Sequence, residues 1–320
     1  IDMTRDGSRI AISFPGYDIK GSPGIGLVRV YDLKSGLDPS WVQAGQDILG
    51  KSLFESIGYI NLKMNSLNGS KVFISVSYRE NAAIRAYEFN PDVKEWIQVG
   101  DADISAPHPC PGSGRSFTVS ADGNRLAYVS NYGIVEAPSQ MDVLDFDVDN
   151  NKWKPVGNTI YGVISSDSSG SGFGYNTVMS SDGKTIAISS IDPDCYGSPD
   201  FCDSGSVEVL VFDPSAKRFR KVPPVPSSIA NGNILEQGEK DSDNSIFGML
   251  SSMSVDGSKL SVGGYNFVDS QGFLKIYDLG RLFYMNCPVE FPDLIGDGKC
   301  EGFFPYNSED CGFDGGDCLL

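Results

Sequence analysis

The chain repeats one stretch, whose clearest copy is Ser120-Ala121-Asp122-Gly123-Asn124-Arg125-Leu126-Ala127-Tyr128-Val129. An Asp-Gly or Asn-Gly pair between two runs of alternating apolar residues is a strong signal for a tight β-hairpin. Such pairs occur at Asp6-Gly7, Asn68-Gly69, Asp122-Gly123, Asp182-Gly183 and Asp256-Gly257. The glycines follow one another at intervals of 54 to 74 residues. A period of this length is typical of a repeat architecture.

Each repeat carries four strand-like segments. The first leads into the turn, at 58–62, 117–120, 173–178 and 247–250. The second follows it, at 9–12, 71–74, 125–128, 185–188 and 259–262. The third ends in an aromatic residue followed by an acid, at 28–32, 84–88, 143–147, 209–213 and 274–278. The fourth contains Trp41, Trp96 or Trp153, with Phe219 in the same place in the fourth repeat. All three tryptophans of the protein occupy this one position, which supports the alignment of the repeats.

Four short strands in every repeat, without helical periodicity between them, predict the blades of an all-β propeller over residues 1–283. A single four-stranded sheet cannot bury both of its faces, whereas blades packed around an axis can. We therefore expect the tryptophans and the Tyr or Phe residues to lie between blades. Five repeats are visible. The fifth lacks the Trp segment and the first lacks its Phe-Gly lead-in, so the intact ring has five, six or seven blades.

The repeat resembles a known family. Its pattern, as at Ser181 to Ile188, Val28 to Tyr31, Trp41 to Gly45 and Phe173 to Tyr175, is similar to FG-GAP repeats of the integrin α-chain type. Large secreted proteins of diatoms and other algae carry similar arrays. Many FG-GAP repeats hold calcium in a loop of alternating aspartates, whereas each turn here has a single Asp or Asn before Gly. A calcium ion needs six to eight oxygen ligands, so we expect no calcium in these turns and assign the aspartates to turn geometry.

Residues 284–320 have a different character. Four of the seven cysteines lie there, among many Gly and Asp residues and almost no strand pattern. So short a segment needs disulfides or a metal ion to fold, because it cannot bury a sufficient core. Asp314 and Asp317 flank a Gly-Gly turn that lets both carboxylates face one point. Oxygen ligands without histidine indicate calcium rather than zinc.

This segment resembles the Lin-12/Notch repeat, a small extracellular calcium-binding module, through Gly296-Asp297-Gly298-Lys299-Cys300 and the Phe-Asp-Gly-Gly-Asp-Cys stretch at 313–318. The resemblance implies one calcium ion bound by Asp297, Asp314 and Asp317, with backbone carbonyls beside Cys300. Asn307 has a structural role in the family and is a weaker candidate. The resemblance also implies the disulfides Cys287–Cys311 and Cys300–Cys318, because both partners of the family's third bridge are absent here. A purely structural role for the module, as a stapled cap on the propeller, stays open.

Three further cysteines and one sequon bear on the compartment. Cys195 and Cys202 bracket a Gly/Pro loop and are spaced to form a disulfide, which leaves Cys110 either unpaired or joined to a cysteine upstream. Disulfide-rich usage is typical of an oxidising compartment, so we expect a secreted or cell-surface protein. Asn68 in Asn68-Gly69-Ser70 is the one glycosylation acceptor, on an expected exposed turn.

The balance of charge restricts the partners. The chain has 42 acidic and 25 basic residues and a net charge of −17, which argues against nucleic acid or an anionic membrane. No run of 18 apolar residues is present, so we expect no membrane span. The chain opens at Ile1 within an expected strand, without methionine or signal peptide, and we interpret it as a mature or truncated piece.

The sequence shows no marked catalytic group. His108, the only histidine, lies in a Pro-rich loop, and the acids at 192, 194, 200 and 203 and at 241 and 243 form two loop clusters that we interpret as solvated. The favoured hypothesis is therefore a non-enzymatic extracellular recognition or adhesion module that binds calcium and holds a protein or glycan on the propeller face. The alternative is a secreted carbohydrate-active hydrolase or lyase, with paired acids at the propeller axis.

Overall fold

A computed structural model describes residues 1–36, 39–78, 81–105, 116–130, 139–162, 173–190, 206–221, 234–236, 245–266 and 271–279. Within these ranges all regular structure is β-sheet, without a helix. It follows that these ranges contain no helix of the length and apolarity needed to cross a membrane. The predicted module at 284–320 lies outside the described residues.

The strands form five successive antiparallel sheets, here called blades 1 to 5. Blade 1 contains β1 (Asp2–Met3), β2 (Arg9–Phe14), β3 (Leu27–Lys34), β4 (Ser40–Gln43) and β5 (Ile48–Leu49). Blade 2 contains β6 (Leu62–Met64), β7 (Lys71–Tyr78), β8 (Asn81–Asn90) and β9 (Glu95–Ser105). Blade 3 contains β10 (Phe117–Val119), β11 (Arg125–Ser130), β12 (Gln140–Asp147), β13 (Lys152–Pro155) and β14 (Ile160–Tyr161). Blade 4 contains β15 (Phe173–Met179), β16 (Thr185–Ser190), β17 (Ser206–Asp213), β18 (Arg218–Lys221) and β19 (Ile234–Glu236). Blade 5 contains β20 (Ser245–Met253), β21 (Lys259–Asn266) and β22 (Gln271–Asp278).

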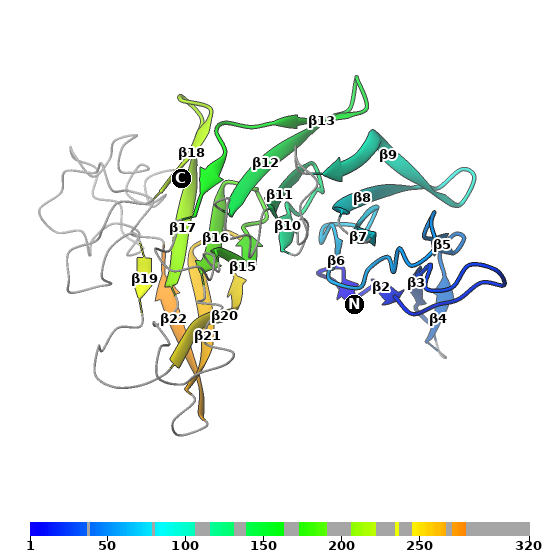
Figure 1. Ribbon diagram of the computed structural model, residues 1–320, viewed down its shortest axis with the longest axis horizontal. Coiled ribbons are helices and arrows are strands. Elements are labelled where there is room, and N and C mark those ends of the chain that lie inside the picture. Colours follow the sequence, from blue (N-terminus) through cyan, green and yellow to red (C-terminus); the bar gives the residue numbers. More distant parts are fainter. Residues whose placement is uncertain are drawn as a thin grey trace, which may run out of the picture.

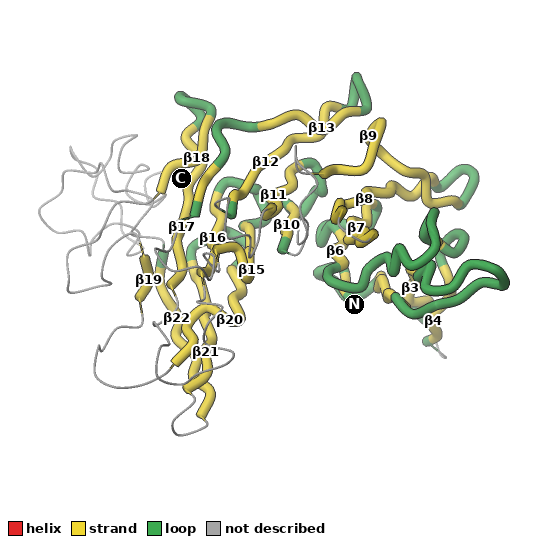
Figure 2. Tube along the Cα trace, in the orientation of Figure 1, coloured by secondary structure: helices red, strands yellow, loops and turns green. Residues whose placement is uncertain are grey.

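The blades follow one another as in a β-propeller, which confirms the predicted all-β propeller. The first strands of successive blades, β1, β6, β10, β15 and β20, contact one another and form the inner edge. Blade 1, blue in Figure 1, and blade 5, yellow to orange there, stand at the two ends of an open arc, which Figure 2 shows in the same orientation. Four separate apolar clusters lie between neighbouring blades, as expected for sheets that bury both faces.

The turns hold their shape through side chains of the repeated motif. In the third blade, the Ser120 hydroxyl donates to Asp122 Oδ1 at 2.5 Å, and the backbone N–H groups of Asn124 and Arg125 donate to Asp122 Oδ1 and Ser120 Oγ at 3.0 and 2.9 Å. Gly123 has a φ of 68°, a conformation that favours glycine. Equivalent aspartate bonds form around Asp6, Asp182 and Asp256. The predicted hairpins are therefore confirmed. Each connecting loop is longer than the two residues of the tightest hairpin turns, and the Asp side chain forms hydrogen bonds within this longer loop.

Backbone hydrogen bonds connect these turns from blade to blade. The residue before the turn Asp or Asn donates its N–H to a carbonyl in the turn of the next blade. The bonds are Arg5 to Ser66, Leu67 to Ala121, Ala121 to Ser181 and Ser181 to Val255, at 2.8 to 2.9 Å. These bonds follow one another along one end of the inner strands. Each turn therefore closes its own hairpin and is also hydrogen-bonded to the turn of the next blade.

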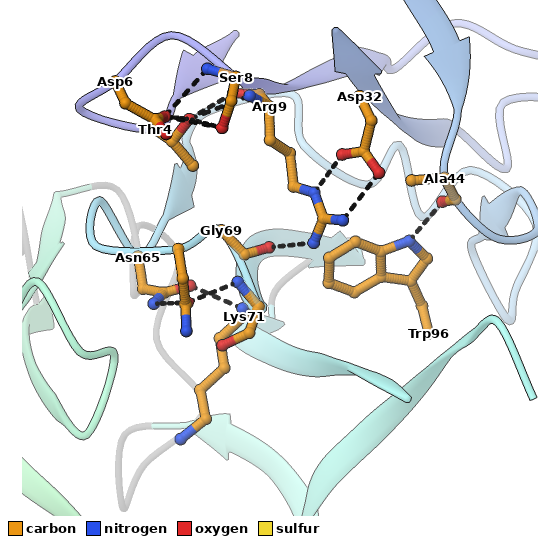
Figure 3. A network of polar contacts seen from close by, with 12 residues as sticks. Thr4, Asp6, Ser8, Arg9, Asp32, Ala44, Asn65, Gly69, Lys71 and Trp96 are labelled. Carbon is orange, nitrogen blue, oxygen red and sulfur yellow. Dashed lines mark hydrogen bonds and ion pairs between the residues drawn. The ribbon is translucent and has the colours of Figure 1, made fainter. Parts of the chain in front are cut away.

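A cation at the start of the second strand reaches from one blade into the next (Figure 3). Arg9 binds Asp32 of its own blade through Nε and Nη2, at 2.5 and 2.9 Å. Its Nη1 donates to the Gly69 carbonyl of blade 2 at 3.0 Å. The guanidinium also lies 5.0 Å from the Phe89 ring centre and 5.9 Å from that of Trp96, both in blade 2. Such cation–π contacts contribute about 0.5 to 2 kcal/mol each.

The same contact set joins blades 3 and 4. Arg125 binds Asp145 through two bonds of 2.6 and 2.8 Å and donates to the Gly183 carbonyl at 3.1 Å. Its guanidinium lies 4.6 Å from the Phe212 ring and 5.7 Å from the Phe219 ring. The spacing from the Asp-Gly pair is the same as for Arg9, so the turn motif positions this blade-to-blade clamp.

Blades 2 and 4 vary the clamp. Lys71 donates to Asn124 Oδ1 of blade 3 at 2.6 Å, and its ammonium lies 4.8 Å from the Phe146 ring. In blade 4, Thr185 stands opposite Val211 at the places of the cation and its acid. Blade 4 therefore meets blade 5 mainly through aliphatic packing.

The outermost strands confirm the predicted alignment of Trp41, Trp96, Trp153 and Phe219. Each of the four pairs with the equivalent residue of the third strand, namely Leu33, Phe89, Phe146 and Phe212. The glycine that follows receives the next blade's indole: Gly45 has a φ of 79°, and a Cβ there would lie 2.8 Å from Trp96 Cδ1. Trp96 is 3% exposed, as expected for a residue between blades. Trp41 departs from that expectation at 44% exposed, because within the described residues no blade precedes blade 1.

The turn aspartates predict an acid-sensitive fold. Hydrogen bonds from the Ser254 hydroxyl and Ser258 lower the pKa of Asp256 from 3.8 to about 2, and bonds from Ser8 do the same for Asp6. A carboxylate with a lowered folded-state pKa stabilises the fold above its unfolded pKa, and this contribution disappears as the pH falls through the folded value. We expect the urea concentration at the unfolding midpoint to decrease as the pH is lowered from 4 to 2. The variant Asp256→Asn should show a smaller decrease. Asp149→Asn, at an exposed hairpin position, serves as the control; equal curves for both variants would contradict the assignment.

Candidate functional site

Most of the predicted site residues lie outside the described residues. This holds for Asp297, Asp314 and Asp317, for Cys287, Cys300, Cys311 and Cys318, for Cys195, Cys202 and Cys110, for His108, and for both loop clusters of acids. Within the described ranges, no group of three or more His, Cys, Asp or Glu side chains could hold a metal ion. The calcium site and the disulfides therefore stay predictions.

Asn68 is exposed on its turn, as expected for a glycosylation acceptor. Its Oδ1 accepts hydrogen bonds from Asn65 Nδ2 at 2.8 Å and from the Ser70 N–H at 3.0 Å. Asn68 thus takes the role that Asp has in the other turns. Its glycosylation stays a prediction.

Hydroxyl and amide side chains join the inner strands. Ser116 Oγ donates to Thr177 Oγ1 at 2.9 Å, and Ser251 Oγ donates to Asn176 Oδ1 at 2.7 Å. Of the five first strands, only β1 carries a carboxylate, that of Asp2, which accepts the backbone N–H of Met64 at 2.7 Å. These strands hold no pair of acids for glycoside chemistry. The hydrolase alternative stays a prediction, since loops near the axis are partly outside the described residues.

Exposed apolar side chains gather on two loops beside blade 1, residues 15–26 and 50–60, here called the loop surface (green in Figure 2). Phe54 is 63% exposed and Tyr59 is 71% exposed. Tyr17, Ile19, Leu53 and Ile60 add further exposed apolar area. Exposed apolar patches on a folded protein mark interaction sites. The strand predicted from residue 58 begins only at Leu62, so Tyr59 and Ile60 belong to this loop.

The backbone of the loop surface adopts an unusual conformation. Phe54 and Ser56 have φ angles of 60° and 46°, in the left-handed region that side chains other than Gly, Asn and Asp seldom adopt. Their N–H groups donate to the carbonyls of Pro23 and Gly24, at 3.0 and 2.9 Å, which ties the two loops together. Positive φ at such residues costs about 1–3 kcal/mol each and is concentrated at functional sites.

A buried ion pair anchors the segment that has this conformation. Glu55, between the two strained residues, is paired with Arg85 of β8 at 2.8 Å, and both side chains are at most 4% exposed. Arg85 also binds Asp103 at 2.6 Å. Burial would lower the pKa of Arg85, but the hydrogen bonds and charges of Asp103 and Glu55 raise it above its ordinary value. The Glu55 carboxylate also accepts the backbone N–H groups of Lys51 and Ser52.

Blade 1 has the exposed counterpart of this pair. Arg29 occupies the place of Arg85 in the repeat and binds Asp47 at 2.8 Å, with the side chains 33% and 30% exposed. The loop carboxylate of Glu55 is an addition to this pattern in blade 2. Sequence analysis missed it, because a lone glutamate in an apolar loop carries no spacing signal. The apolar pair Leu53-Phe54 beside Glu55 is the one feature of the sequence that could have drawn attention to this loop.

Comparisons with known proteins add the fold only. No family model matches the chain, and no curated protein matches it. Among solved structures, the β-propeller domain of Cps50 (Swd1) from Myceliophthora thermophila is similar at 7% identity, with 87% of this chain and 72% of that chain covered and a TM-score of 0.43. The periplasmic gluconolactonase PpgL of Pseudomonas aeruginosa is similar at 15% identity, with 86% and 71% covered and a TM-score of 0.43. Neither likeness assigns a function to this chain.

The buried pair yields a test of the loop surface. We expect Glu55→Gln to cost about 3–5 kcal/mol of unfolding free energy, because it leaves the Arg85 charge buried with one partner fewer. The amides of Lys51 and Ser52 should also lose protection from hydrogen exchange, since their acceptor weakens. Asp47→Asn is the matched control at the exposed pair and should cost less than about 1 kcal/mol. Equal losses for the two variants would contradict the anchoring role of Glu55.

Proposed function

We propose that the chain is a recognition or adhesion module of a secreted or cell-surface protein, and that the loop surface binds a protein partner. The observation that carries this proposal is the strained, ion-pair-anchored backbone that presents Phe54 to solvent. A conformation held at an energetic cost, with its ring exposed, is organised before binding. Rigid aromatic anchors of this type are the residues that dominate protein interfaces.

The composition of the loop surface favours a protein over a glycan. The exposed aliphatic side chains Leu53, Ile60 and Ile19 lie on the same two loops as the aromatic rings. Sugar sites combine rings with polar groups that bond hydroxyls, whereas the core of a protein interface is apolar with a polar rim. The net charge of −17 favours a partner with a basic surface, because opposite charges speed the encounter.

Binding to cells or matrix from the native source tests this function. We expect Phe54→Ala and Tyr59→Ala each to weaken binding of the labelled protein by about 30-fold, the loss typical of an interface hot spot. Both side chains are exposed, so thermal stability should not change. Val93→Ala, at an exposed valine of the β8–β9 hairpin, should bind like the unmodified protein. Protease treatment of the cells should remove binding. Undiminished binding of both aromatic variants would contradict the proposal.

We also propose that residues 284–320 form a calcium-binding module, as the Lin-12/Notch resemblance implies. Its predicted ligands Asp297, Asp314 and Asp317 come together only in the folded module, so binding free energy becomes folding free energy. Three carboxylates without the ion repel one another, which adds to the cost of the empty site.

Calcium removal should therefore act locally. We expect a chelator to reduce hydrogen-exchange protection in residues 287–320 of the full chain, while the β-sheet signal in circular dichroism stays unchanged. Asp314→Ala should do the same with calcium present. Asp310→Ala is the control within the same segment, at an acid that the resemblance does not assign to calcium. Equal protection with and without chelator would mean that disulfides alone hold the module.

A further inference from the structure

Blade 5 presents an apolar face on which none of the described blades packs. Its other face meets blade 4 through one apolar cluster, to which blade 5 contributes Phe247, Leu260, Val262, Phe273 and Tyr277. Residues that alternate with these along a strand point to the opposite side. Leu274 and Ile276 of β22 do so, and Leu250 of β20 stands in the same row as Leu274, across Gly263. These three side chains, 66 to 71% exposed, are here called the free face of blade 5.

Every other blade buries the two positions that Leu274 and Ile276 occupy in blade 5. Strand register places eight residues there on the third strands, namely Val28 and Val30, Ile84 and Ala86, Met141 and Val143, and Val207 and Val209. All of them are at most 2% exposed. Each pair belongs to the apolar cluster that joins its blade to the following one. The free face of blade 5 is therefore composed like one half of a junction between blades.

A hollow of about 520 Å³ lies on this face. Leu250 and Leu274 line it, with Gly263 between them in the middle strand. A Cβ at Gly263 would meet no atom closer than 3.6 Å, so the packing of blade 5 itself does not require a glycine at this position. The missing side chain leaves room for an apolar group from another sheet.

The turn of blade 5 also carries the features that join one blade to the next. Lys259 stands opposite Asp278 in register, where Arg9 and Arg125 stand opposite an acid in blades 1 and 3. In those blades the cation extends onto aromatic rings of the following blade. Val255 precedes the turn aspartate, at the place from which each earlier blade donates an N–H to the next turn. Among the described residues, no carbonyl accepts the Val255 N–H.

Blade 1 presents the complementary half of a junction. Met3, Leu33 and Trp41 are 39 to 45% exposed and are here called the receiving face of blade 1. Leu33 and Trp41 pair across their strands, and Met3 pairs with Ile10, on the side away from blade 2. The equivalent of Trp41 in blade 2 is Trp96, which packs against blade 1 and is 3% exposed. The same side of blade 1 is therefore built to pack against a preceding blade.

The two halves do not meet within one chain. Blades 1 and 5 stand at opposite ends of the open arc (Figure 1), and none of the four apolar clusters of described residues includes both blades. We propose that the free face of blade 5 binds the receiving face of blade 1 in a second copy of this chain. Each copy carries both faces, so one pair of chains can make the contact twice about a twofold axis, which closes the assembly. The contact uses no residue of the loop surface and does not depend on the proposed function.

Sedimentation equilibrium of the full chain tests this contact. We expect dimers that dissociate on dilution. Leu274→Glu and Trp41→Glu each place a charge in an apolar junction and should weaken dimerisation by at least about 30-fold, the loss typical of an interface hot spot. Ile276→Ala is a milder truncation and should weaken it by about tenfold. All three side chains are exposed in the single chain, so circular dichroism should show folded variants.

A mixture of the two charged variants makes the test specific. In a mixed pair, the unmodified blade 5 of the Trp41→Glu chain can meet the unmodified blade 1 of the Leu274→Glu chain. One contact of the two is then intact, so association should return in part. Val148→Glu is the matched control, at a valine that is 71% exposed in the β12–β13 hairpin, and should dimerise like the unmodified protein.

Three results would overturn the proposal. The first is a monomer at the highest soluble concentration. If Leu274→Glu then lowers the thermal midpoint, blade 5 is covered within its own chain, and hydrogen exchange would show whether blade 1 or residues 280–320 cover it. The second is a dimer that Leu274→Glu dissociates and Trp41→Glu does not, which would indicate contact between two free faces of blade 5. The third is equal dimerisation of Leu274→Glu, Trp41→Glu and Val148→Glu.

Discussion

The cation that follows the turn in each of blades 1 to 3 is the contact on which most of this fold depends. Arg9, Lys71 and Arg125 stand at one position of the repeat, and each extends from its own blade onto aromatic rings of the next. The two arginines also donate hydrogen bonds to a carboxylate of their own blade and to a turn carbonyl of the following blade. One side chain thus fixes a hairpin, a sheet and the neighbouring sheet together.

The clamp also explains where the pattern changes. At the fourth blade both members of the ion pair are replaced, by Thr185 and Val211, and the strand-four tryptophan becomes Phe219. An isolated charge at this interface would be costly to bury, so the pair changes as a unit to residues that pack without charge. The junction between blades 4 and 5 consequently differs from the junctions that carry the clamp.

The loop surface is built at a junction between blades rather than on a single sheet. The loop surface depends on Glu55, which lies in the loop between blades 1 and 2 and forms an ion pair with Arg85 of blade 2. In a repeat protein each blade contacts only its neighbours, so variation at one junction leaves the others intact. Recognition can therefore differ from junction to junction within a constant frame.

The amino-acid sequence alone determined the repeat, the antiparallel blades, the hairpins at Asp-Gly and the shared position of Trp41, Trp96 and Trp153. These features rest on local turn chemistry and on alternation along a strand, which act over a few neighbouring residues. Only the tertiary structure decided that Trp41 is exposed while Trp96 is buried, because burial depends on whether another blade lies behind. It also decided that Phe54 is held in a left-handed conformation beside the buried pair of Glu55 and Arg85. Such pairs are distant in sequence and carry no common spacing, since the contacts that join them arise only when separate blades pack together.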